Sequence, residues 1–495
     1  MTFWLGIDVG TGGTRALLVN AQGKVVHSFI APHEEIRMER PMWAEQRPEN
    51  WWDAGKQAIR GVLAQAHASG NDVRGIGLSG QMHGLVMLDG ADRVIRPALI
   101  WCDQRSQAQV DSINRSIGSD AVLAWTANPV LTGFTLPKLL WVRDQEPAQF
   151  ECLCKILLPK DYIRFCLTSE YATDVSDASG TSLFDVARRR WSDEMLERVN
   201  LVRSILPAAL ESSRISGRVS RSAADATGLA AGTPVVAGGG DQAASAVGNG
   251  IVEAGTVSCT IGTSGVVFAF MESPEHDVRG RVHTFCHSVE DAWHVMGVTQ
   301  GAGLSLQWFR NNLAPGTAYD ALTTEAASAP AGAQGLFWLP YLMGERTPHL
   351  DASARGGWIG LTAKHTRADL IRALMEGVSY SQKDCLDIIE QMGVAVESVR
   401  LSGGGARSEF WQQMLADVFG KPVSILENQE GSAYGAALLA LVGTGEYSSL
   451  REICKAAIRE VRTCEPQAAE QKIYAEGHRT YRSLYPAIKG VLSPP

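Results

Sequence analysis

The chain has 495 residues, more than one ordinary domain holds, so we expect about two to four domains. Its net charge of −8 at pH 7 comes without a compensating cluster of Lys and Arg, which argues against a nucleic-acid partner. Nine cysteines without a CxxC pair fit a reduced, cytoplasmic compartment, and we expect neither a signal peptide nor an apolar run of the ~18 residues that cross a membrane.

The first part of the chain alternates apolar strands with glycine turns. We expect the strands of a meander at residues 3–9, 15–19 and 24–30, with turns at residues 10–13 and 21–23. Apolar residues at helical spacing predict a helix over residues 51–68. A short apolar strand over residues 73–78 then ends at the polar segment 79–84.

The middle of the chain repeats the opening. Residues 256–271 hold an apolar strand, the turn Gly262-Thr263-Ser264-Gly265 and a second apolar strand, as residues 7–14 do around Gly10-Thr11-Gly12-Gly13. Since the two copies lie about half the chain apart, they indicate two related lobes. The alternative is a pair of unrelated hairpins that share common turn residues. We expect an N-terminal lobe over residues 1–246 and a C-terminal lobe over residues 247–495, joined by a tight hinge.

Three further elements have glycine-rich borders. An apolar strand over residues 234–237 leads through three glycines to Asp241 and a small-residue helix over residues 243–250. A strand over residues 399–401 leads through glycines 403–405 to a helix over residues 409–419. The Ala- and Leu-rich residues 431–441 predict a buried helix that packs closely on a neighbour.

The glycine turns suit a polyphosphate. A polyphosphate needs several backbone N–H donors at short range, and glycine lets the backbone approach without a Cβ clash. Either hairpin alone is more typical of a plain turn, but two matched copies and a third glycine turn favour a phosphate site. The chain has no GxxxxGK[ST] segment, which excludes a P-loop.

Two carboxylates stand next to these turns. Asp8 lies near the end of a buried type of strand, where it needs an ion pair or a cation such as Mg²⁺, or caps its own turn. Asp241 opens a helix after three glycines, where it could accept the proton of a hydroxyl that attacks a phosphoryl group. A helix N-cap is the alternative for Asp241, and one residue can serve both roles.

Polar residues after apolar strands are further candidates for ligand contacts. Gln81-Met82-His83-Gly84 and residues 101–105 are such segments, although a lone histidine is more often structural. His283, Cys286 and His287 invite a metal site, but on a strand side chains four apart do not converge as on a helix, so we expect no metal there.

Taken together, these motifs resemble the FGGY family of carbohydrate kinases, and within it the xylulokinases, over nearly the whole length. Their joint order and spacing is the specific signal. The opening Asp8 to Thr11 with Arg15 resembles the first phosphate segment of the family. The other matching segments are residues 133–141, 238–241, 262–265, 344–348, 360–376 and 403–408.

The resemblance implies an α/β, two-lobed, actin-like (ribonuclease H-like) ATPase fold with an interlobe cleft. It implies ATP-dependent phosphorylation of D-xylulose to D-xylulose 5-phosphate, with ATP and Mg²⁺ as cofactors. By this carry-over Asp241 is the general base, and Asp8 assists catalysis and, with Asp241, the metal. The sugar contacts are Met82, His83, Asp103, Asp241 and Gln242. The ATP contacts are Gly10, Thr11, Arg15, Gly262, Thr263, Gly404, Gly405 and Ala406.

Two departures from the family pattern bear on the substrate. Gly12 stands where the family often has Ser or Thr, and Gln242 stands where xylulokinases often have Asn. A kinase for another polyol, such as ribulose or glycerol, therefore stays open, as do a non-catalytic sugar-responsive binding protein and an actin- or chaperone-like ATPase. The expected partners are a small-molecule sugar and ATP, with no nucleic acid and no membrane, and a homodimer is left open.

Overall fold

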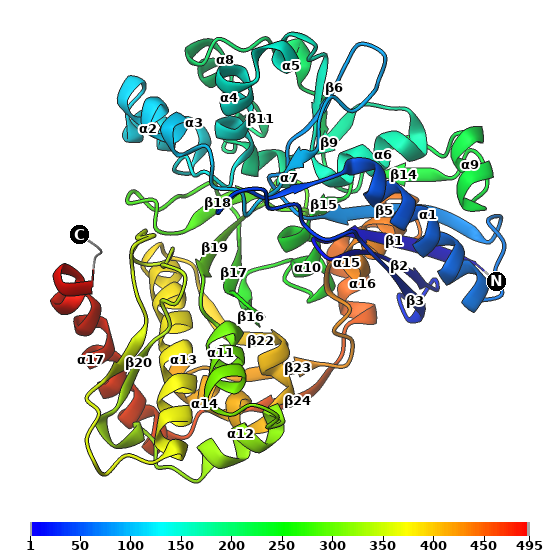
Figure 1. The fold of residues 1–495 in the computed structure, drawn as a ribbon. Coiled ribbons are helices and arrows are strands. Elements are labelled where there is room, and N and C mark those ends of the chain that lie inside the picture. Colours follow the sequence, from blue (N-terminus) through cyan, green and yellow to red (C-terminus); the bar gives the residue numbers. More distant parts are fainter. Residues whose placement is uncertain (1, 493–495) are drawn as a thin grey trace.

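Two seven-stranded mixed sheets form the centres of two lobes (Figure 1). The structure is a computed structural model, and it describes residues 2–492. The first sheet has the path β13-β14-β5-β1-β2-β3, with β15 paired to β5, and the second has the order β18-β19-β17-β16-β22-β23-β24. The strands of the first sheet are β1 Phe3–Val9, β2 Gly13–Val19, β3 Val25–Pro32, β5 Val73–Gly80, β13 Ile215–Arg218, β14 Pro234–Val236 and β15 Gly239–Gly240.

The second sheet repeats the arrangement of the first. In both, a hairpin strand runs antiparallel to its predecessor (β1–β2 and β16–β17), and a strand from later in the chain pairs in parallel with the first hairpin strand (β5 and β22). The predicted repeat of the glycine hairpin is thus confirmed by topology. The strands of the second sheet are β16 Gly255–Ile261, β17 Gly265–Met271, β18 His283–Cys286, β19 Trp293–Thr299, β22 Val396–Gly403, β23 Val423–Leu426 and β24 Glu460–Cys464.

Helices cover both sheets and build a cap on the first lobe. Against the second sheet pack α13 Arg367–Gln391 and α14 Glu409–Phe419, and on these two helices pack α11 Gly303–Leu313, α12 Tyr319–Ala327 and α17 Ala468–Leu492. The cap at the top of Figure 1 has its own apolar core. It includes α2 Gln107–Ser116, α3 Ser119–Thr126, α4 Thr135–Gln145, α5 Pro147–Glu151 and α8 Asp193–Arg198. In the part of the chain that is described, no helix is both long and apolar enough for a membrane span.

The two faces of β1 contact different helices. Alternate strand residues point to opposite faces. Leu5 and Ile7 belong to the core under α1 (Pro48–Gln65), whereas Trp4 belongs to the core under α15 (Gly431–Gly443) and α16 (Leu450–Ala457). Asp8 is on the same face as Trp4, and its side chain therefore lies beside α15, as its interaction with Ser432 shows.

Helix α15 comes late in the chain but packs on the first lobe. Figure 1 shows it in orange below the blue strand β1, and it contacts β1, β5 and α10 (Asp241–Gly248). The predicted division between residues 246 and 247 separates the two sheets in sequence, and it stays a prediction as a domain boundary. Residues 431–457 return across it, which chain order alone did not indicate.

The approach of α15 to its neighbours leaves no room for side chains at three glycines. A Cβ at Gly77 would lie 1.8 Å from the carbonyl oxygen of Ala436, and one at Gly6 would lie 1.9 Å from that of Ala433. A Cβ at Gly435 would lie 1.7 Å from the carbonyl oxygen of Ala244 on α10. The predicted close packing of residues 431–441 is confirmed, and backbone-to-backbone contact is its physical basis.

The predicted elements differ from the observed ones mainly at their ends. Helix α1 begins at Pro48 rather than at residue 51, because proline suits the first turn, where its missing N–H has no helical partner. The helix expected from residue 243 begins at Asp241. Helix α14 has the predicted bounds.

A group of five charged side chains is buried between β9 (Ala172–Asp174), α6 (Pro159–Thr168) and α7 (Val175–Ala178). Lys160 Nζ lies 2.7, 2.8 and 3.2 Å from carboxylate oxygens of Asp161, Asp174 and Asp177, and Arg164 pairs with Asp161 at 2.6 Å. Burial, together with the charges of Asp161 and Asp174, raises the pKa of Asp177 well above its usual value. A protonated Asp177 makes the group electrically neutral.

We predict that Gly77→Ala destabilises the first lobe. The added methyl group would meet the backbone of α15, which cannot move aside as a flexible side chain can, so a loss of roughly 3 kcal/mol is expected, as for overpacked cores. Urea unfolding measures the effect. Gly90→Ala is the matched control, since nothing lies within 4 Å of a Cβ there. Equal unfolding midpoints for the two variants would contradict the close contact.

We predict that Lys160→Met is far more disruptive than Lys56→Met. Removal of Lys160 leaves three buried carboxylates with only Arg164 as a cation, and removal of one partner of a buried pair costs about 3–5 kcal/mol. Lys56 pairs at the surface with Asp53, where such a pair is worth about 0–1 kcal/mol. Thermal unfolding of both variants compares them, and a shift no larger for Lys160→Met than for Lys56→Met would refute this role.

Candidate active site

Strand register brings Asp8 and Asp241 to one place. Asp8 on β1 is paired with Ser79 on β5, and Ser79 is paired with Gly239 on β15. Asp241 follows β15 directly and is the first residue of α10. The negative charge of Asp8 raises the pKa of Asp241, so the two carboxylates lie within electrostatic reach of each other.

Asp8 has an unsatisfied oxygen. Its Oδ1 atom is buried and has no hydrogen-bond partner among residues 2–492. Burial raises the pKa of Asp8, although Ser432, Ser79 and Arg15 act in the opposite direction. A buried carboxylate oxygen without a partner is costly, and it can bind a cation.

Asp241 is perturbed in the same direction. Burial, and then the negative charge of Asp8, raise the pKa of Asp241 to about 7, whereas Gln242 lowers it. The backbone just before Asp241 is hydrogen-bonded, through Ser176, to the buried charged group around Lys160. Gly240 N–H donates to Ser176 Oγ at 3.1 Å, and Ser176 Oγ donates to Asp174 Oδ2 at 2.5 Å. The backbone that carries Asp241 is therefore held in place, and the pKa of its carboxyl group lies near neutral pH.

Two carboxylates side by side suit a hard divalent cation. Mg²⁺ takes oxygen ligands and usually keeps several waters, so one or two carboxylates together with substrate phosphates suffice. Asp8 and Asp241 fit this donor set, with Asp8 Oδ1 as an available oxygen. Within the described residues, no three His, Cys, Asp or Glu side chains are grouped as a metal site, which includes the neighbourhood of His283 and His287.

The second hairpin and the third glycine turn line one cavity of about 650 Å³. Gly262 and Thr263 contribute from the β16–β17 turn, and Gly404 and Gly405 follow β22. Ala406, the remaining predicted contact of this group, does not line the cavity. It is 2% exposed, and its carbonyl accepts a hydrogen bond from Gln412.

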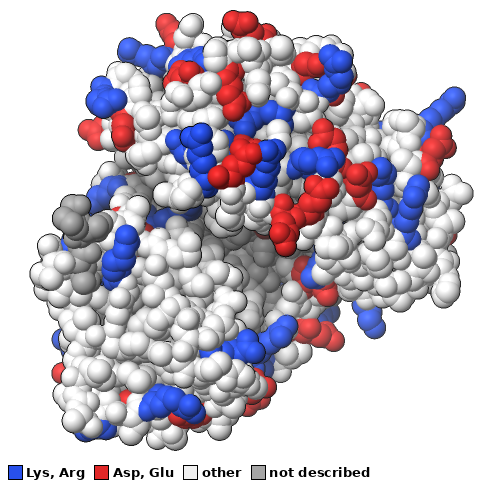
Figure 2. All heavy atoms as spheres, viewed as in Figure 1, with Lys and Arg blue, Asp and Glu red and all other residues white. Residues whose placement is uncertain are grey.

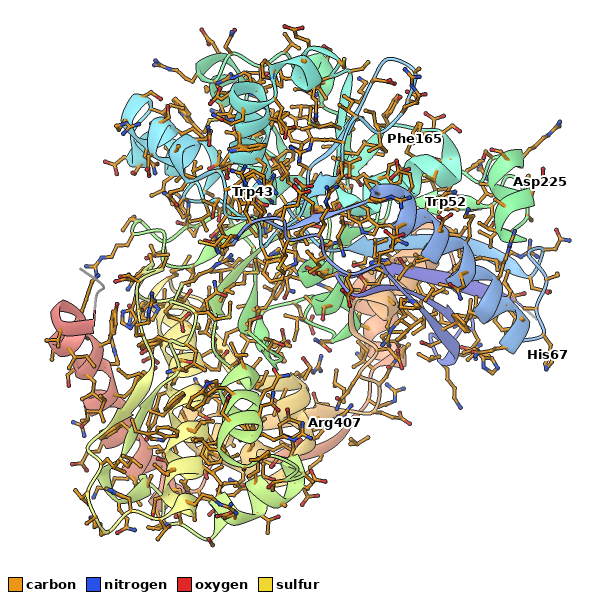
Figure 3. All side chains as sticks on the ribbon, in the orientation of Figure 1. Trp43, Trp52, His67, Phe165, Asp225 and Arg407 are labelled. Carbon is orange, nitrogen blue, oxygen red and sulfur yellow. The ribbon has the colours of Figure 1, made fainter. Side chains whose placement is uncertain are left out.

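Sequence reasoning missed several residues that line this cavity. They come from α11, α12 and the segment after β22, and they are Gly303, Leu306, Gln307, Tyr319, Asp320, Thr323, Arg407, Ser408 and Trp411. Figure 3 labels Arg407 on the second lobe beside the opening between the lobes. The available signal was the glycine pair Gly301 and Gly303 after β19. Gly303 N–H donates to the Gly262 carbonyl at 2.7 Å, which ties α11 to the hairpin.

The first hairpin is more engaged within the protein than predicted. Thr11 Oγ1 donates to Gln81 Oε1 at 3.3 Å and accepts from Trp101 Nε1 at 3.0 Å. Arg15 forms an ion pair with Glu430, immediately before α15. Each turn is closed by a backbone bond of 3.0 Å, but the first turn is one residue longer, since Gly10 N–H donates to Gly13 O and Gly262 N–H donates to Ser264 O.

Met82 and His83 follow β5 at the positions where Gly405 and Ala406 follow β22. His83 Nδ1 lies 2.7 Å from the carbonyl of Gly180, which can only accept, so Nδ1 carries the hydrogen and Nε2 is an acceptor. The imidazole stacks on Phe134 with 4.5 Å between ring centroids. Burial, followed by the charge of Lys138, holds the pKa of His83 well below its usual value, so the ring is neutral at pH 7.

The last two predicted sugar contacts differ in their surroundings. Gln242 lies beside Asp241 at the start of α10 and is partly exposed. Asp103 is fully buried, and its carboxylate accepts from Ala44 N–H at 2.7 Å and from Arg105 Nε at 2.9 Å. Its oxygens are thus used inside the protein, behind the site.

Figure 2 shows a hollow between the upper and lower parts of the molecule, and the candidate site groups come from both lobes. The first lobe contributes two carboxylates and a neutral imidazole, and the second contributes a cavity lined by glycine backbone. Such an arrangement can hold a phosphate chain on one side and an acceptor hydroxyl beside a base on the other.

Comparison with known proteins gives a consistent result. The chain is 42% identical to a xylulose kinase of Escherichia coli, covering 97% of this chain and 98% of that protein, and 40% identical to one of Bacillus subtilis, covering 99% and 98%. A solved xyloylose kinase structure from Brucella ovis is 36% identical, with a TM-score of 0.92, over 99% of this chain and 100% of that one.

These similarities confirm the α/β, two-lobed, actin-like fold with its interlobe cleft. Two family models match. The N-terminal domain of the FGGY family of carbohydrate kinases matches residues 3–248, and its C-terminal domain matches residues 257–444. The chain therefore belongs to the FGGY family of carbohydrate kinases.

Proposed function

We propose that this kinase transfers the γ-phosphoryl group of ATP to the terminal hydroxyl of D-xylulose, giving D-xylulose 5-phosphate. The observation that carries the proposal is Asp241, a carboxylate with a pKa of about 7 at the start of α10, under the influence of the second carboxylate Asp8. The substrate class follows the relatives named xylulose kinase, which cover nearly the full chain.

In the proposed reaction Asp241 accepts the proton of the attacking hydroxyl. A base is most effective when its pKa lies near the working pH, and a value of about 7 meets this condition. Most of the catalysis in phosphoryl transfer comes from positioning and charge stabilisation. The bond from Gly240 to Ser176 keeps the backbone of Asp241 in place.

The two hairpins bind the phosphates in this proposal. Gly10, Thr11 and Arg15 act from the first lobe, and Gly262 and Thr263 from the second. The adenosine lies beside Gly404, Gly405 and Ala406. Since the Ala406 side chain is buried, this residue acts by supporting the backbone of the turn. Mg²⁺, held by Asp8 and Asp241 together with the phosphates, offsets negative charge when it is bound.

The sugar lies along Met82, His83 and Gln242 in the proposed complex. Neutral His83 offers Nε2 as an acceptor for a sugar hydroxyl, since its other nitrogen is bonded to Gly180. Asp103 supports this region through Arg105 and the backbone of Ala44 rather than through contact with the sugar.

A cytoplasmic location agrees with nine cysteines that are all free thiols.

A substrate panel with coupled ADP detection tests the function. We expect D-xylulose to give the highest kcat/KM among D-xylulose, ribulose, glycerol and related polyols, and ATP turnover to depend on the sugar. A preference of more than about tenfold for another polyol, equal to ~1.4 kcal/mol of barrier, would replace the substrate. Turnover without sugar would instead indicate an ATPase, and sugar binding without turnover a binding protein.

Asp241→Asn should bind sugar and ATP but lose at least about 100-fold in kcat, because it cannot take the proton. Asp225→Asn is the matched control, an exposed residue at the far edge of the first lobe (Figure 3). Near-normal turnover of Asp241→Asn would remove the residue from its proposed role.

The pH profile of kcat/KM provides a second test of Asp241. The base must be ionised, so activity is full above a pH of about 7 and falls as the pH drops through that value. The negative charge of Asp8 contributes to the raised pKa of Asp241. In Asp8→Asn the acid limb of the residual activity should therefore move to lower pH. An unmoved limb, or a shift to higher pH, would show that the two carboxylates do not interact.

A further inference from the structure

A continuous set of hydrogen bonds joins the first phosphate hairpin to the proposed sugar segment. Thr11 of the hairpin is bonded through its hydroxyl to Gln81 Oε1, at 3.3 Å, and to Trp101 Nε1, at 3.0 Å. Gln81 directly precedes Met82 and His83, and Trp101 directly precedes Cys102 and the 103–105 segment. One hydroxyl thus contacts both segments that border the proposed sugar position.

Gln46 adds three further hydrogen bonds to this set. Its Nε2 donates to the Thr11 carbonyl at 2.8 Å, and its Oε1 accepts from Gln81 Nε2 at 2.9 Å and from Trp51 Nε1 at 3.1 Å. The side chain is 5% exposed, so these bonds are shielded from water. Gln46, Gln81 and Thr11 form a closed ring in which each residue is bonded to the other two.

The backbone that carries Gln46 is fixed independently. Gln46 pairs with Ala98 in the short ladder of β4 (Glu45–Gln46) and β7 (Ala98–Leu99). The adjacent Glu45 pairs with Arg96 at 2.5 Å and with Arg105 at 2.7 Å. The Arg105 guanidinium lies 3.8 Å from the ring centre of Trp43, which Figure 3 labels in the interior of the first lobe. The amide of Gln46 therefore has a fixed position, and it holds the groups to which it is hydrogen-bonded in place.

We propose that Gln46 is a positioning residue that couples the two substrates: it ties the phosphate hairpin to the sugar segment, so that sugar and ATP each strengthen the binding of the other. The inference rests on the proposed function. A sugar that orders the 81–83 segment also orders Gln81, and through the ring it fixes the Thr11 peptide in the hairpin. Because coupling between two binding sites is reciprocal, ATP strengthens sugar binding by the same factor.

The ring explains why this effect depends on Gln46 rather than on the Thr11 hydroxyl alone. The Thr11 to Gln81 bond is long at 3.3 Å, whereas both ring bonds of Gln46 are shorter than 3.0 Å. An amide supplies a donor and an acceptor in one rigid plane, and it can hold a carbonyl and an amide at once. A hydroxyl also donates and accepts, but from a single atom, whereas the amide does so from two separate atoms.

The test measures binding of Mg²⁺ with a non-hydrolysable ATP analogue, by calorimetry, with and without saturating D-xylulose. In the unaltered protein we expect the sugar to tighten analogue binding at least about fivefold, within the usual range of coupling. In Gln46→Met the factor should fall below about twofold, while the Kd for D-xylulose alone stays nearly unchanged. Gln57→Met, at an exposed position of α1, is the matched control and should keep the full factor.

Gln46→Glu guards against misfolding of the methionine variant. Glutamate keeps the acceptor for Trp51 and Gln81, but when ionised it cannot donate to Thr11, so it should also lose the coupling at pH 8. A factor that is unchanged in either variant overturns the inference, as does an unaltered protein without coupling. These results leave phosphorylation of D-xylulose intact, whereas absence of D-xylulose binding or turnover in the unaltered protein overturns the proposed function and this inference together.

Discussion

The structure depends on the direct contact of helix α15 with the strands of the first sheet. Gly6 and Gly77 bring two strand backbones against the helix backbone, and Gly435 does the same between α15 and α10. This contact brings the late part of the chain back to the first lobe and places Ser432 beside Asp8. It also sets the start of α10, where Asp241 stands. The positions of both carboxylates therefore depend on glycines at which no side chain would fit.

A second consequence of this packing is electrostatic. Asp8 and Asp241 are both half-buried at one strand end, and Asp8 adds to the effect of desolvation in raising the pKa of Asp241. The neighbouring group around Lys160 is also crowded with carboxylates, but there two cations balance them and the network supports the backbone through Ser176. The two clusters differ in one respect that matters for chemistry. Arg15, the cation that acts on Asp8, is half-exposed and paired with Glu430, which leaves the first cluster able to take up a proton or bind a metal.

Much of this arrangement could be predicted from the sequence, because local signals carried it. The repeated hairpins, the strand before Asp241 and helix α14 were predictable from apolar periodicity and glycine turns, and the repeat extends to the order of both sheets. The destination of α15 was not predictable, since a buried small-residue helix fits either lobe. The helices that carry the cavity residues Gln307, Tyr319 and Asp320 have no distinctive sequence pattern. These residues belong to the site because they line the same cavity as the second hairpin. Asp103 was expected at the sugar because it follows a strand, but nothing local revealed that Arg105 and Ala44 use its oxygens.

The matching registers of the two sheets have a consequence for the direction of the reaction. Asp8 faces Ser79 across β1 and β5, and Thr260 faces Ser402 across β16 and β22, so Thr260 is the counterpart of Asp8 in the other lobe. The duplicated scaffold thus keeps an acidic group at only one of two equivalent positions. The neutral side is compatible with the donor nucleotide, and the acidic side with the hydroxyl that must lose a proton. The two sides of the cleft therefore differ in charge at this pair of positions, as they also differ at Asp241 and His83, so the duplicated lobes are not interchangeable.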